Sequence, residues 1–370
     1  MTEAEVATAT RFVLALSFAI GLAFGALAQR VRFCTMGAIA DLVVTGDASR
    51  IRMWAIAAGT AMVGFNAMVW FGWVQATDSI YASSRFAWLS AAMGGLVFGM
   101  GMVLASGCTS KNLLRAGGGS LKAVVVLLVV ALAGFATLKG ITAVVRVGTV
   151  DAVAWSLAST QDLPALLGGF GGMSPRSFAG LFALAIGIAV LAAASAALRR
   201  HDIEGVVGGV GIGALVVAVW WVSGGVGHVA EHPATLEPAF LATSSRRMES
   251  LSFVAAVSYA MDYLLFFSDA SKTLTIGIVS AAGLVAGSAL YAIASRTFRW
   301  EGFAGVADLR DHLLGGAMMG IGGVTGLGCT VGQGLSGVST LSIGSFLAVA
   351  SMLVGAYATL KVTMWRSEAD

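Results

Sequence analysis

The chain has 370 residues, of which 58% are hydrophobic and 11% are charged, and its formal net charge is +3. Soluble globular domains carry about 25% charged residues, so this composition, with a mean hydropathy of +0.88, excludes an ordinary soluble domain. The small net charge favours no nucleic-acid partner.

Apolar segments long enough to cross a hydrocarbon core of about 30 Å recur along the chain. In chain order we expect membrane spans at residues 11–29, 53–74, 87–106, 121–144, 177–197, 206–222, 251–267, 274–295, 309–327 and 341–363. The sequence therefore predicts an all-α polytopic integral membrane protein in contact with lipid, with about 9–10 spanning helices. Residues 1–370 are expected to form a single integral-membrane domain.

Each of the three cysteines lies where an apolar, glycine-rich segment ends, and each is followed by threonine: Cys34-Thr35, Cys108-Thr109 and Cys329-Thr330. The next segments, TMGAIADLVV, TSKNLLRAG and TVGQGLSGV, can form helices but are too short to cross a bilayer. In each of them, threonine occupies a position typical of an N-cap or a first helical turn. At each cysteine we expect a long span, then a break that the glycine residues make possible, and then a re-entrant half-helix.

Such breaks have a defined chemistry. A helix N-terminus presents unpaired backbone N–H groups and about half a positive charge, which together favour an anion. Irregular backbone at membrane depth is tolerated only where it is buried or lines a cavity. A neutral thiol is a weak donor and a soft, polarizable group, so burial must keep it protonated to bind an anion. The three thiols therefore indicate a shared path for an anion with a terminal sulfur.

The second and third cysteines lie in a sequence repeat. Residues 94–109 read GGLVFGMGMVLASGCT and residues 315–330 read GGAMMGIGGVTGLGCT, 221 positions later, and ATLK recurs at 136–139 and 358–361. The pattern predicts an internal duplication with pseudo-two-fold symmetry, a common plan of transporters. We expect halves near 11–146 and 177–363, joined by a connector at 147–176. The counterpart of the first cysteine is expected near 208–225, where serine and glycine replace it.

Two polar residues follow the breaks closely. Lys111 could attract an anion, because an ionisable group at membrane depth is a functional candidate, or it could snorkel to the interface. Gln333 could donate its amide N–H to a sulfonate oxygen. The predicted substrate-binding residues are the cysteines, their threonines, two neighbouring glycines and these two polar residues: Cys34, Cys108, Cys329, Thr35, Thr109, Thr330, Gly107, Gly328, Lys111 and Gln333.

Two metal hypotheses have weaker support. His228, Glu231 and His232 match the H-x-x-E-H pattern of a zinc peptidase, but Pro233 follows directly, so we favour an interfacial loop. The 15 methionines could indicate Cu(I) handling, although their spacing is ordinary for apolar helices. We expect no metal and no cofactor.

The Gly-Cys-Thr break, present twice, and the earlier Arg32-Phe33-Cys34-Thr35-Met36-Gly37 resemble the YeeE/YedE sulfur-transport family over nearly the whole chain, and within it the thiosulfate-uptake permeases. The resemblance implies a multi-pass permease of hourglass shape in the bacterial inner membrane. It implies that thiosulfate or a related sulfur anion is passed between Cys34, Cys108 and Cys329 by S–H···S contacts. It also implies a small cytoplasmic sulfurtransferase of the TusA type as partner.

We therefore expect a permease rather than an enzyme. The alternatives are a membrane thiol enzyme or sulfur carrier that forms persulfides, and a soft-metal permease. The first lacks the Cys-x-x-Cys pair usual for such chemistry. No G-x-x-x-x-G-K-[ST] motif for ATP is present, so transport must be driven by gradients or by consumption of the product.

Overall fold

The computed structural model describes residues 2–168, 174–198 and 202–369, and all statements below concern these residues. The helices of the first part are α1 (Glu3–Arg30), α2 (Thr35–Val44), α3 (Ser49–Phe71), η1 (Ala76–Asp78), α4 (Trp88–Leu104), α5 (Thr109–Gly117), α6 (Leu121–Lys139), α7 (Ile141–Gly148) and α8 (Leu163–Gly168). Those of the second part are α9 (Pro175–Leu198), α10 (Ile203–Trp221), η2 (Val222–Val226), α11 (Phe253–Leu265), α12 (Ile276–Ala294), α13 (Val306–Thr325), η3 (Gly332–Gly337) and α14 (Ile343–Ala369). Two short antiparallel ladders pair β1 (Arg85–Phe86) with β2 (Trp155–Ser156), and β3 (His228–Val229) with β4 (Ala239–Phe240).

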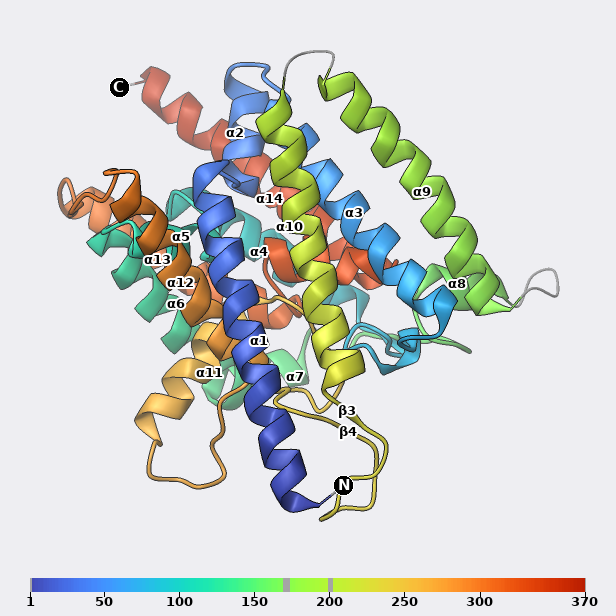
Figure 1. The fold of residues 1–370 in the computed structure, drawn as a ribbon. Coiled ribbons are helices and arrows are strands. Elements are labelled where there is room, and N and C mark those ends of the chain that lie inside the picture. Colours follow the sequence, from blue (N-terminus) through green and yellow to red (C-terminus); the bar gives the residue numbers. More distant parts are fainter. Residues whose placement is uncertain (1, 169–173, 199–201, 370) are drawn as a thin grey trace.

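A helix occupies most of every predicted span, although the span 121–144 is divided at Gly140 between α6 and α7, and the chain is an all-α polytopic membrane protein (Figure 1). Among the described residues, eight helical segments are long and apolar enough to cross a membrane, fewer than the ten predicted spans. The other two segments differ for separate reasons. α11 has only 13 residues, and the first turns of α13 carry Asp308, Arg310 and Asp311.

The helices pack in related pairs. α1 packs along α12 as α10 packs along α3, and α4 packs on α14 as α13 packs on α6. Glycines make these contacts close: Gly21 and Gly25 of α1 lie against the backbone of α12, and Gly209 and Gly213 of α10 lie against α3. Small residues allow such approach between membrane helices. This pairing is what the internal duplication predicts.

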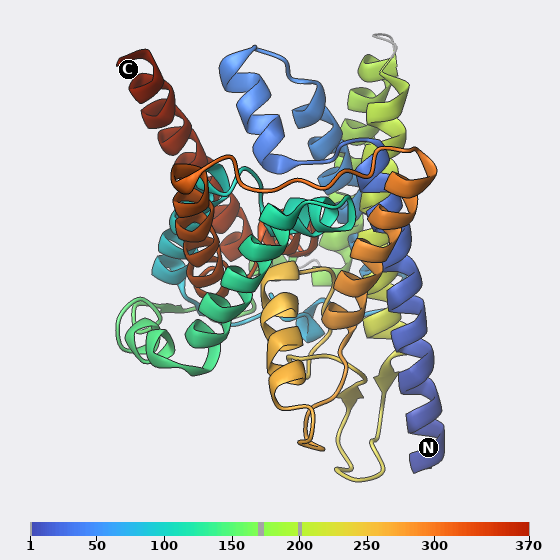
Figure 2. The ribbon, with the colours of Figure 1, turned by 90° about the vertical axis from the view of Figure 1, so that its left-hand side faces the viewer.

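The pairing also defines which short helices correspond. α2 packs on α3 and α14, whereas α11 packs on α12 and α6, so α11 is the equivalent of α2. In both views α2 lies toward the end that holds the C-terminus, and α11 lies toward the end that holds the N-terminus (Figures 1 and 2). The two sets of helices are therefore inverted relative to each other. Among the described helices, α9 has no equivalent in the first set, and the boundaries 11–146 and 177–363 stay predictions.

α4 and α13 form the centre of this arrangement. They run antiparallel, because Gly94 lies against Gly326 while Gly101 lies against Gly315. Each of the two helices ends at a cysteine break, and the thiols of Cys108 and Cys329 are buried in the core. The fold thus places both breaks inside the protein.

Candidate functional site

The three cysteine breaks share one backbone geometry. The residue two positions before each cysteine is left-handed, with φ of 54–57° at Arg32, Ser106 and Leu327. The residue directly before each cysteine donates its N–H to the carbonyl five positions back, at 2.8–2.9 Å: Phe33 to Ala28, Gly107 to Met102 and Gly328 to Gly323. This is the hydrogen bond of a Schellman helix end. It turns the chain so that the cysteine begins a new, short helix.

Each cysteine lies at the N-cap of its half-helix, and the threonine after it is the first helical residue, one of the two positions predicted for it. Cys34 begins α2 and its Sγ accepts the N–H of Gly37 at 3.3 Å. Cys108 begins α5, and its Sγ lies 3.2 Å from the Oγ of Ser110. All three cysteines are free and buried. Backbone N–H groups aimed at a sulfur also favour negative charge at that point.

Cys329 lies between two helix N-termini. It precedes the segment 330–339, whose middle is the π-helix η3, and its Sγ accepts the N–H of Gly332 at 3.4 Å. The N–H of Phe253, the first residue of α11, is directed at the same sulfur. Cys108 is within electrostatic range of both Cys329 and Cys34. The structure therefore brings the three predicted thiols into one buried region.

The breaks at Cys108 and Cys329 also share unpaired polar oxygens. The hydroxyls of Thr109 and Thr330 are buried and have no partner in the described part of the chain, nor have the side-chain oxygens of Asn112 and Gln333. These residues lie one and four positions after their cysteines. Buried polar groups are normally hydrogen-bonded, so repeated exceptions indicate a place for water or ligand. Thr35 is likewise buried, in the first turn of α2.

The amide groups support the turns. Gln333 donates from Nε2 to the carbonyl of Gly326 at 2.6 Å, and Asn112 donates from Nδ2 to the carbonyl of Gly107 at 2.9 Å. One amide hydrogen of Gln333 is therefore used to hold the break itself. The predicted contact between Gln333 and a sulfonate oxygen would need the second.

Lys111 supplies a cation beside two of the thiols. It is half-buried, it acts electrostatically on Cys34, and no carboxylate of the described residues pairs with it. The nearby Arg50, by contrast, pairs with Asp41 at 3.2 Å. The methylene groups of Lys111 cover Gly107, where an added Cβ would lie 3.0 Å from Cγ. An unneutralised ammonium next to a thiol favours an anionic ligand.

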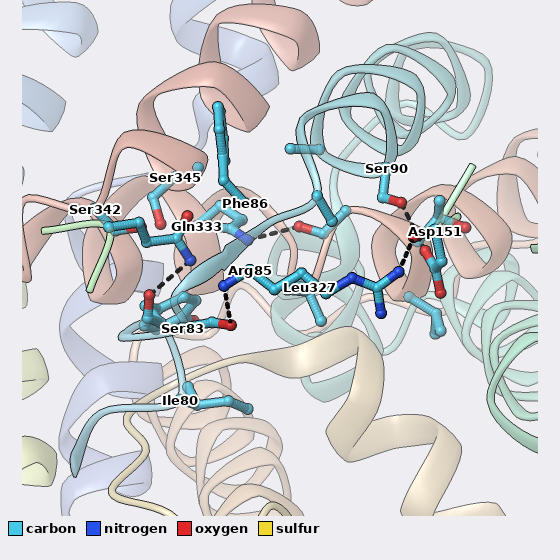
Figure 3. A pocket seen from close by; sticks show the side chains of 18 of the residues that line it. Ile80, Ser83, Arg85, Phe86, Ser90, Asp151, Leu327, Gln333, Ser342 and Ser345 are labelled. Atoms are coloured by element: carbon cyan, nitrogen blue, oxygen red, sulfur yellow. Dashed lines mark hydrogen bonds between the residues drawn. The ribbon is translucent and has the colours of Figure 1, made fainter. Parts of the chain in front are cut away.

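Two cavities meet next to the Cys329 break. The first, of about 210 Å³, is lined by Arg85 and Arg146 and reaches Gln333 and Ser345; Figure 3 shows Arg85 extending toward Asp151 and Ser90. The second cavity, of about 240 Å³, reaches Gly328 and the N-terminus of α11. The lining residues common to both cavities are Ile80, Tyr81, Arg146, Val324 and Leu327. Arg146, which pairs with Asp151 at 3.0 Å, therefore lies at the boundary of two cavities near the Cys329 break.

Tyr81 lies at this boundary, and Glu249 lines the second cavity. Tyr81 donates its hydroxyl to the carbonyl of Gly332 at 2.7 Å, and burial raises the pKa of Tyr81, so the phenol stays protonated. Glu249 lines the second cavity, where its carboxylate accepts hydrogen bonds from Ser244 and Ser245. Burial raises the pKa of Glu249 as well.

The sequence-based site omitted several of these residues. Asn112 could have been found, because it follows Cys108 by the same four positions that separate Gln333 from Cys329. Tyr81, Arg146 and Glu249 lie in loops or a short helix far from any cysteine in sequence, and their position depends on tertiary packing.

The H-x-x-E-H residues lie elsewhere, around β3. His228 packs its ring on Phe240, and His232 accepts the N–H of Ala234 at Nδ1. Within the described residues, no cluster of three histidine, cysteine or acidic side chains could hold a metal ion.

Comparison with known proteins agrees with this architecture. A family model described as sulphur transport matches residues 30–358. The thiosulfate transporter TsuA of Escherichia coli K12 is 24% identical over 354 residues, 91% of this chain and 91% of that protein. The thiosulfate transporter TsuA of Spirochaeta thermophila is 23% identical over 91% of this chain and 94% of its own. The probable transporter YedE of Escherichia coli K12 is 30% identical over 28% of this chain.

Proposed function

The chain belongs to the sulphur transport family, and from this premise we propose that it is a permease that takes up thiosulfate, or a closely related sulfur anion, across the bacterial inner membrane into the cytoplasm. Two relatives named as thiosulfate transporters match 91% of the chain, which supports this substrate. The observation that carries the proposal is that three buried cysteine thiols lie close together, each at the N-terminus of a half-helix. Such a set suits an anion that carries a soft sulfur.

The proposed path runs past the three thiols in turn. The anion enters through the two cavities, reaches Cys329, passes to Cys108 and leaves beside Cys34. The electrostatic contact of Cys108 with both other cysteines supports its middle position. Lys111 and the half-helix N-termini offset the negative charge, since oriented N–H groups act as fixed partial charges.

The thiols hold the terminal sulfur by hydrogen bonds in this mechanism. A thiol is a weak donor, so each contact is loose enough to break as the next one forms. No bond to sulfur has to be made or cleaved. A cytoplasmic sulfurtransferase of the TusA type would remove the transported sulfur, and this consumption could drive net uptake.

The proposal is tested with purified protein in lipid vesicles and labelled thiosulfate. We expect the vesicles to take up thiosulfate without added Cu(I), and we do not expect them to take up Cu(I) in its place. Intact-protein mass spectra recorded during transport should show no thiosulfate-derived adduct. An adduct on Cys108 or Cys329 that forms and decays at the rate of uptake would instead support a persulfide-forming protein. Vesicles that accumulate Cu(I) but no thiosulfate would contradict the proposal.

A further inference from the structure

The internal pairing leaves one half-helix without a cysteine. α11 is the equivalent of α2, since each packs on the corresponding long helices of its own set. The N-cap of α2 is Cys34, with φ −159° and ψ 119°, and the N-cap of α11 is Ser252, with φ −148° and ψ 126°. The backbone conformation is therefore similar at both N-caps. The side chain of Cys34 ends in sulfur, whereas that of Ser252 ends in oxygen.

This assignment corrects the sequence-based expectation. The counterpart of Cys34 was expected near 208–225, but there α10 continues into the π-helical turn η2. Ser223 is buried in that turn and donates to the carbonyl of Trp220. A loop of 26 residues, 227–252, separates the turn from α11. Because this loop is so long, the correspondence between α11 and α2 is not visible in the sequence.

The hydroxyl of Ser252 is available to a ligand. It does not cap its own helix, and it makes no hydrogen bond to the described part of the chain. Cys34, in contrast, uses its sulfur to accept the N–H of Gly37. Ser252 also lines the second cavity, together with Gly328, the residue directly before Cys329.

Ser252 is also next to the thiol. A Cβ added at Gly332 would lie 2.5 Å from its Oγ, and Gly332 is the residue whose N–H reaches the sulfur of Cys329. The next residue, Phe253, directs its N–H at the same sulfur. The hydroxyl of Ser252 and the N-terminus of α11 thus line one end of the cavity, directly behind which lies the buried thiol of Cys329.

From this arrangement we propose that Ser252 is a substrate-binding residue that donates its hydroxyl to an oxygen of the sulfur anion while Cys329 contacts the terminal sulfur. The proposal rests on the proposed function and narrows its substrate class to sulfur oxyanions. A hydroxyl is a much better donor to oxygen than a thiol is. Thiosulfate offers both kinds of atom, so the pair Ser252–Cys329 recognises both of its ends.

The test is calorimetric binding of thiosulfate to purified protein. We expect Ser252→Ala to raise the Kd about tenfold, because a hydrogen bond to a charged ligand is lost, with little change in Tm. Ser250→Ala is the matched control: Ser250 lines the same cavity, but its hydroxyl donates to the carbonyl of Val216 at 2.9 Å. We expect that variant to keep its Kd within about twofold.

Ser252→Cys keeps the side chain's shape and carries a weaker donor, and it provides the same measurement if the alanine variant does not fold. We expect its Kd to rise severalfold. Wild-type affinity in Ser252→Ala, or in Ser252→Cys, would overturn the assignment of Ser252 while the wild type still binds thiosulfate. Absence of binding by the wild type would overturn the proposed function itself.

Discussion

The Cys108 break and the Cys329 break have the same backbone turn, but their surroundings differ. Cys108 begins α5, a regular helix that also carries the cation Lys111, and this cation acts electrostatically on the neighbouring thiol of Cys34. Cys329 begins a segment that is π-helical at Gly332–Gly337 and fully buried, and its preceding residue Gly328 lines the same cavity as Ser252. π-Helical turns are frequent at functional sites. The duplicated scaffold thus supports two different environments for one anion.

This difference in surroundings suggests that the two breaks have different roles in binding the anion. A site with a cation binds an anion by charge, whereas a site of neutral donors selects it by the positions of those donors. We expect the Cys108 break to determine how strongly the anion is attracted. We expect the Cys329 break to determine which anion is accepted.

Removing either thiol should have the largest effect, because both breaks lie on the proposed path. Cys108→Ala and Cys329→Ala should each lower thiosulfate uptake about 100-fold or abolish it, since each loses a hydrogen bond to a charged ligand. Growth on thiosulfate as sole sulfur source and vesicle uptake measure this. Normal growth of both variants at normal protein levels would contradict the site.

Changing the charge at the Cys108 break should come next. Lys111→Gln should raise the apparent KM about tenfold and make uptake less sensitive to salt, because an attractive charge is lost. Lys111→Arg should retain most of the activity. Arg310→Gln removes an equal charge from an exposed position and serves as the control. Equal KM values for Lys111→Gln and Arg310→Gln would show that only net charge matters.

The two glycines before the thiols offer a direct comparison. A Cβ at Gly328 would lie 3.2 Å from the backbone nitrogen of Gln333, whereas at Gly107 it would meet the flexible methylene groups of Lys111. We therefore expect Gly328→Ala to destabilise the protein by roughly 1–3 kcal/mol and Gly107→Ala by less. Thermal unfolding in detergent checks the order. Equal Tm values would mean that the two substitutions destabilise the protein equally.

The smallest effect should come from pH at the Cys329 side. The pKa of Glu249 is raised by burial, so the native protein binds a proton more tightly than the unfolded chain. Stability should therefore fall as pH rises from the usual glutamate pKa of about 4.3 through the raised value. The ionised carboxylate would also repel the anion in a cavity shared with Tyr259 and Arg146.

Glu249→Gln should flatten both pH profiles, because the amide does not ionise. Thermal unfolding and uptake across the acid to neutral range measure the two effects. A profile that stays unchanged in Glu249→Gln would assign the pH dependence to another group.

Local chemistry made much of this structure predictable. Glycine-rich apolar segments predicted the long helices, and the Cys-Thr steps predicted half-helices that begin at Cys34, Cys108 and Cys329. The repeat was visible because Gly94 in one copy and Gly315 in the other pack against the opposite helix, where a side chain would not fit. Such positions keep the same residue in both copies.

The features that the sequence did not predict depend on contacts between residues that are distant in sequence. Ser252 was hidden because the loop before it is much longer than the Cys34 turn, so no fixed offset leads to it. Tyr81 reaches Gly332 across 251 positions. α13 was predicted as a full span, although its first turns carry Asp308 and Arg310, because the apolar second half dominates the segment.

The glycine-lined helix pairs join each half of the molecule to the other half. α1 lies against α12, α10 lies against α3, and α4 lies against α13. Alternating access by rocking one rigid half over the other would separate all three contacts at once. Closely packed helices resist such sliding, because packing is lost on every contacting face. We therefore expect the moving part to be small, with the short segments at the cysteines acting as gates inside a static frame.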